Sequence, residues 1–152
     1  ILFYIFLWLL YKKRIGRAIN VKLLITSLGS IFGICGGICF IGVAFTPADL
    51  SIAIHEWHNS FNMWAFKLFL ASTICYTWII FKSKIIHNKY LIMNLIFLCS
   101  LFFYVLVLIY GPSPREPGGI LFQGVAQKFI MFNFIFSIIT QTMGFKKLID
   151  KY

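Results

Sequence analysis

Hydrophobic residues gather along the chain into long runs separated by short polar segments. The runs cover residues 1–11, 23–45, 59–81, 90–110 and 120–143. All but the first reach the ~20 residues that an apolar helix needs to cross a bilayer. Unbroken runs of this length are typical of helices, whereas a membrane β-barrel shows shorter segments of alternating polarity. The pattern therefore predicts an all-α, polytopic bundle of transmembrane helices with five spans.

Composition supports this prediction. Of the 152 residues, 61% are apolar and only 12% are charged, a balance that suits a bilayer rather than water. The first run is about half of the ~20 residues of a full span. We therefore expect a truncated first span in this chain. Because five spans with the cytoplasmic C-terminus predicted below place residue 1 outside, we expect six spans in the intact protein. Short loops without a linker predict a single membrane domain over residues 1–152.

The basic residues predict an orientation. The formal net charge is +10, and most lysines and arginines lie in the segments 12–22, 82–89 and 146–151. Such segments are retained in the cytoplasm, so we expect a cytoplasmic C-terminus and outward loops at 46–57 and 111–119. We predict the plasma membrane as the location. Membrane topology explains the charge, and nucleic acid is not an expected partner.

Small residues within the runs predict helix packing. Gly33 and Gly37 have the G-x-x-x-G spacing that lets membrane helices approach closely. All four cysteines fall inside apolar runs, where they suit packing better than metal binding. Pro47, at the end of the second run, is predicted to have a structural role. No metal and no cofactor are predicted.

Polar residues at the predicted outward ends of the third and fifth runs form the candidate site. The pocket candidates are Asp49, His55, Glu56, His58, Asn59, Gln127 and Lys128. His55 and His58 are three residues apart, whereas the metalloprotease motif H-E-x-x-H separates its histidines by four. A shared metal would need Asp49 or Glu56 as a further ligand. Anchoring of the span by His and Trp rings at the headgroup level is the structural alternative.

Lys67 and Lys128 each lie about 12 Å beneath the predicted outer surface, at 1.5 Å per residue. Ionisable groups at such depth are costly and generally face the bundle interior or water. Two interpretations stay open: a structural polar network, or a cavity that receives an anionic group. Lys67 is assigned a structural role here.

A resemblance adds to this picture. The segment from Gly42 to Asp49, the His58-Asn59 pair and the Gln127-Lys128 pair resemble motifs of a prokaryotic membrane family of unknown function, DUF nine-nine-eight. That family is distantly similar to the DRAM autophagy modulators and to PGAP-type lipid-remodelling proteins. The resemblance covers roughly residues 23–143. It implies a six-span protein concerned with lipids, with an outward polar pocket that includes Pro47.

The leading hypothesis is a lipid-associated membrane protein whose outward pocket binds a lipid headgroup or a similar ligand. The alternative is an intramembrane lipid-modifying enzyme in which His58 or Glu56 acts as general base. A small-solute transporter ranks third, since neither interrupted spans nor inverted repeats are evident. Membrane lipids are the predicted partners, and a homo-oligomer or contact with other membrane helices stays open.

Overall fold

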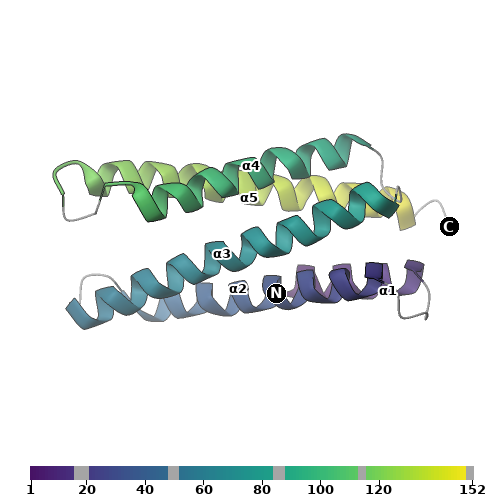
Figure 1. The fold of residues 1–152 in the computed structure, drawn as a ribbon, viewed down its shortest axis with the longest axis horizontal. Coiled ribbons are helices and arrows are strands. Elements are labelled where there is room, and N and C mark those ends of the chain that lie inside the picture. The colour runs from purple at the N-terminus through teal and green to yellow at the C-terminus, as the bar shows by residue number, and fades with distance from the viewer. Residues whose placement is uncertain (16–20, 48–51, 84–87, 113–115, 150–152) are drawn as a thin grey trace. The chain divides into compact units, whose positions relative to one another are not determined.

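The computed structural model describes residues 1–15, 21–47, 52–83, 88–112 and 116–149. These residues form five helices (Figure 1): α1 (Leu2–Ile15), α2 (Val21–Phe45), α3 (Ile52–Ser83), α4 (Asn88–Tyr110) and α5 (Gly119–Ile149). Four of them, α2 to α5, are long and apolar enough to cross a membrane. The all-α class is thereby confirmed, together with four helices that could cross a membrane, while the five spans with a truncated first one stay a prediction.

Several helix boundaries differ from the sequence prediction. The loop predicted over residues 46–57 is wrong in its second half, because α3 begins at Ile52. Helix α5 likewise continues to Ile149, beyond the predicted end of its span at residue 143. Hydropathy marks the part of a helix that suits hydrocarbon. A helix satisfies its own backbone hydrogen bonds, so it continues into polar surroundings through residues such as Glu, Trp and Lys.

The chain forms two compact units, Ile1–Ile79 (unit 1) and Ile80–Tyr152 (unit 2), each described here by itself. Unit 1 holds α1, α2 and most of α3. In α2, Gly33 faces Tyr4 of α1, and Gly36 faces Phe69 of α3. A Cβ on Gly33 would overlap the Tyr4 ring. Glycine is therefore required at this position for the close approach of α1 and α2.

Hydroxyl groups also join the helices of unit 1. The Ser72 hydroxyl donates to the Gly29 carbonyl at 2.7 Å, and the hydroxyls of Ser30 and Tyr76 are 2.5 Å apart. All three hydroxyl residues are buried. In a bilayer no water competes for such groups, so a hydrogen bond between helices fixes their register.

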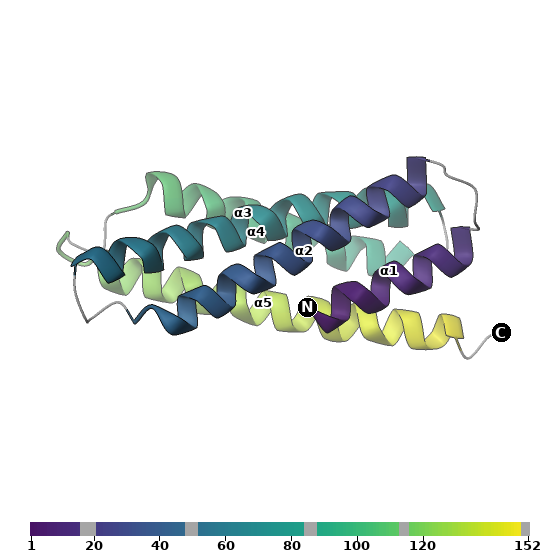
Figure 2. The same ribbon diagram turned by 90° about the horizontal axis from the view of Figure 1, so that it is seen from below.

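Unit 2 contains α4 and α5, which pack against one another in opposite directions (Figures 1 and 2). The Gln141 amide donates to Asn94 Oδ1 at 2.6 Å and to the Ser137 hydroxyl at 3.0 Å. Further along, the rings of Phe97 and Phe134 are 5.7 Å apart. The buried amide cluster and the aromatic contact together set the register of this pair. The predicted single domain spans both units and stays a prediction.

Candidate functional site

The predicted pocket residues fall in different parts of the chain. His55, Glu56, His58 and Asn59 lie on the first turns of α3, in unit 1. Gln127 and Lys128 lie on α5, in unit 2, and Asp49 lies outside the described residues. The pocket as a whole therefore stays a prediction, and the geometry below concerns each unit separately.

His58 is held against the end of α2. Its Nδ1 lies 2.6 Å from the carbonyl oxygen of Thr46, the residue that follows the helix. A carbonyl oxygen only accepts hydrogen bonds, so Nδ1 carries the proton. In the neutral ring, Nε2 then presents a lone pair. This contact satisfies a carbonyl at a helix terminus and also orients an imidazole whose second nitrogen can accept a proton.

Polar residues share one face of α3 around His58. His55, His58, Asn59 and Asn62 recur at the spacing i, i+3, i+4, i+7, which places them on one side of a helix. The Oδ1 atom of Asn62 is buried and has no hydrogen-bond partner within the part of the chain that the structure describes. A buried acceptor without a donor is costly. Sequence reasoning missed Asn62, although its position four residues after His58 indicated the same face.

The surroundings of this face also suit the anchoring interpretation. Glu56 and Asn59 are exposed, and Trp57 is 63% exposed. The Trp57 ring lies 6.1 Å from that of Phe61. An amphipathic indole beside charged and polar groups is typical of a membrane–water boundary. The start of α3 is therefore suited to the headgroup level.

On α5, the structure describes a loop contact and two predicted pocket residues. The Gln123 amide donates to the Pro112 carbonyl at 2.8 Å, which ties the start of α5 to the residues after α4. Gly118 has φ +78°, a conformation that favours glycine, directly before α5 begins. Gln127 is half-buried and Lys128 is exposed.

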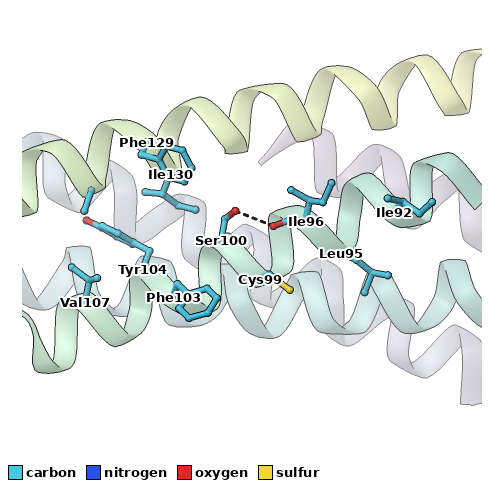
Figure 3. A pocket seen from close by; sticks show the side chains of 11 residues that line it. Ile92, Leu95, Ile96, Cys99, Ser100, Phe103, Tyr104, Val107, Phe129 and Ile130 are labelled. Carbon is cyan, nitrogen blue, oxygen red and sulfur yellow. Dashed lines mark hydrogen bonds between the residues drawn. The ribbon is translucent and has the colours of Figure 1, made fainter.

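A groove of about 530 Å³ runs along α4 and α5 in unit 2 (Figure 3). Leu95, Phe103 and Ile130 are typical of its apolar lining. The hydroxyl of Ser100 is already bonded to the Ile96 carbonyl of its own helix at 2.9 Å, as Figure 3 shows. Specific ligand sites combine apolar walls with a few converging polar groups. Besides Ser100, the lining has only the Tyr104 hydroxyl and the Cys99 thiol among its side-chain polar groups, and the other lining side chains are apolar. It offers contact with hydrocarbon rather than recognition of a headgroup.

Metal ligands do not converge in the part of the chain that the structure describes. No group of three or more His, Cys, Asp or Glu side chains is found among these residues. The four cysteines are free thiols. The alternative in which Asp49 completes a metal site involves a residue outside the described ranges.

The buried polar contacts of both units are a second feature that sequence reasoning missed. They have a simple signature, because Thr26 and Ser30, Ser72 and Tyr76, and Ser137 and Gln141 each lie four residues apart within an apolar helix. Such pairs project from one face. The sequence indicates the faces but not which helix each of them meets.

Comparison with known proteins does not identify the chain: no family model, no curated protein and no solved structure matches it. The resemblance to the DUF nine-nine-eight family, and through it to DRAM and PGAP-type proteins, stays a prediction.

Proposed function

We propose that the protein is a lipid-associated integral membrane protein that binds the polar headgroup of a membrane lipid at the N-terminal end of α3. In this proposal, that end of α3 faces the outside of the plasma membrane. The observation that carries the proposal is the contact between His58 Nδ1 and the Thr46 carbonyl at 2.6 Å. It leaves Nε2 of the neutral ring as a hydrogen-bond acceptor on the polar face of α3.

The chemistry of this face favours a headgroup that donates hydrogen bonds. His58 Nε2 is an acceptor, and the buried Asn62 oxygen one turn deeper is a second acceptor without a partner among the described residues. Ethanolamine offers N–H donors and glycerol offers O–H donors, whereas choline offers neither. We therefore expect the protein to bind ethanolamine or glycerol headgroups more tightly than choline headgroups.

Lipid retention measured by native mass spectrometry tests the proposal. The protein is incubated with phosphatidylethanolamine, phosphatidylglycerol and phosphatidylcholine of identical acyl chains, and the bound lipids are counted. The informative variant is His58→Asn, because its amide N–H can still donate to the Thr46 carbonyl while the acceptor at Nε2 is lost. Ser60→Ala is the matched control, since Ser60 is exposed on the same helix two residues away.

We expect wild type and Ser60→Ala to prefer the two donor-bearing headgroups, and His58→Asn to lose that preference. A hydrogen bond from the uncharged glycerol hydroxyl corresponds to a preference of about five-fold, and one from the charged ethanolamine ammonium to about ten-fold or more. Equal retention of the three lipids by wild type, or an unchanged preference in His58→Asn, would overturn the proposal.

The second candidate function is lipid hydrolysis or transfer with His58 as general base. The same contact favours it, because a base that is oriented through one nitrogen is a recurring arrangement in catalysis. Of the serines near this face in sequence, Ser60 is exposed, and Ser51 and Ser113 lie outside the described residues. The mass spectrometry experiment separates the two functions: a lysolipid or free headgroup that forms with wild type but not with His58→Asn indicates catalysis.

A further inference from the structure

Lys67 is a charged residue within the apolar part of α3. Helix α3 has 32 residues, so at 1.5 Å per residue it is about 48 Å long, more than the ~30 Å hydrocarbon core of a bilayer. Its polar face ends at Asn62, and residues 63–81 form an apolar stretch about 28 Å long. Lys67 is the only charged residue in that stretch. Lys67 lies about 6 Å along the helix from Met63, the residue at which this apolar stretch begins.

The Lys67 side chain points toward the N-terminal end of α3. Its ammonium nitrogen lies 5.4 Å from the centroid of the Trp64 ring, about one turn closer to that end. Side chains on a helix lean toward its N-terminus, so this direction is the natural one. A lysine near the end of a membrane span extends in the same way to bring its charge to the headgroup level.

The positive charge of Lys67 is not neutralised within the described ranges, where the ammonium makes a ring contact but no ion pair. Trp64 is 57% exposed, and its indole N–H has no hydrogen-bond acceptor among the same residues. An ammonium and an indole N–H side by side are both donors. Together they attract an anion, and at a lipid-facing surface the abundant anion is the phosphate of a phospholipid.

This surface differs from the His58 face. Lys67 follows His58 by nine residues, which is about 2.5 turns, so the two side chains leave α3 on opposite sides. The chemistry is also opposite, since His58 presents an acceptor while Lys67 and Trp64 present donors. From these observations we infer that Lys67 and Trp64 form a second lipid site, which binds the phosphate of a phospholipid in the leaflet at the N-terminal end of α3.

The test compares two lipids with the same acyl chains: phosphatidylglycerol, which has a phosphate, and a monogalactosyl diacylglycerol, which has none. Native mass spectrometry gives the ratio of bound phospholipid to bound glycolipid. Lys67→Met removes the charge and keeps the length of the side chain, and Lys67→Arg keeps the charge. Lys82→Met is the matched control, because it removes the same charge from the exposed lysine at the other end of α3.

We expect Lys67→Met to lower the phospholipid preference about five-fold, the effect of one lysine near an anionic surface. Lys67→Arg should retain the preference, Trp64→Phe should lower it in part, and Lys82→Met should change it little. An unchanged ratio in Lys67→Met would overturn the inference. An equal loss in Lys82→Met would also overturn it, because net charge would then explain the preference. His58→Asn should leave this ratio unaltered, so failure of the headgroup proposal is distinguishable from failure of this one.

Discussion

Helices α2 and α3 of unit 1 approach one another along several glycines, whereas α4 and α5 of unit 2 have one such contact, where Gly144 faces the Tyr90 ring, and otherwise meet through larger side chains. In unit 1, Gly36 and Gly42 face the rings of Phe69 and Phe61. In unit 2, the rings of Phe97 and Phe134 lie 5.7 Å apart, and a groove of about 530 Å³ remains along the pair. Small residues let backbones come close in a membrane, and larger ones hold them apart.

The hydrogen bonds of the two units differ in the same way. In unit 1, hydroxyls on short side chains join the helices, as in the hydrogen bond from Ser72 to the Gly29 carbonyl. Unit 2 uses the longer amide of Gln141, which spans to Asn94. A helix pair with several glycines at its interface can therefore be joined by short side chains, whereas the pair that meets mainly through larger side chains is joined by a long one. The two units are therefore sensitive to substitution at different kinds of position: glycines and short hydroxyl side chains in unit 1, and a long amide side chain in unit 2.

The largest expected effect is at the glycine face of α2. Gly33→Ala places a Cβ against the Tyr4 ring, which is buried and stacks on Phe69 at 5.9 Å, so it cannot move aside freely. We expect the free energy of unfolding in detergent to fall by about 3 kcal/mol, the upper range for overpacking. Gly124→Ala is the control, because nothing lies within 4 Å of the added Cβ. If circular dichroism showed the two variants to be equally stable, contact with the Tyr4 ring would not make Gly33 more sensitive to substitution than Gly124.

An intermediate effect is expected at the amide cluster of unit 2. Gln141→Leu removes the donor to Asn94 and to Ser137 while keeping the approximate volume. A hydrogen bond between membrane helices contributes about 0.6 kcal/mol on average. Because Gln141 makes two bonds in a buried cluster, we expect the free energy of unfolding to fall by about 1 kcal/mol. Gln127→Leu on the same helix is the control, since Gln127 makes no hydrogen bond to any described residue. A loss in Gln127→Leu as large as that in Gln141→Leu would contradict the role of the cluster.

Much of this fold could be predicted from the sequence, because hydropathy alone indicates how much of a helix suits hydrocarbon. The start of α3 at Ile52 could not, since polar residues such as Glu56 and Asn59 continue a helix as readily as they form a loop. At the candidate site, the sequence indicated that His58 was out of place in an apolar chain. It did not predict the Thr46 carbonyl as its partner, because that contact depends on the register between α2 and α3.

The smallest expected effects come from two serines whose hydroxyls donate to acceptors of different kinds. The buried Ser72 hydroxyl donates to the Gly29 carbonyl of α2, whereas the half-buried Ser100 hydroxyl donates to the Ile96 carbonyl of its own helix. Ser72→Ala should therefore lower the free energy of unfolding by about 0.6 kcal/mol, the average for a hydrogen bond between membrane helices.

Ser100→Ala removes a hydrogen bond that holds no second helix, and alanine is the better helix former. We expect no loss of stability, with a gain of up to about 0.5 kcal/mol. Thermal unfolding of the two variants in the same detergent measures the difference. If both serines proved equally dispensable, the Ser72 hydroxyl would not fix the register of α2 and α3, and the Ser30–Tyr76 contact and glycine packing would have to position His58 beside Thr46.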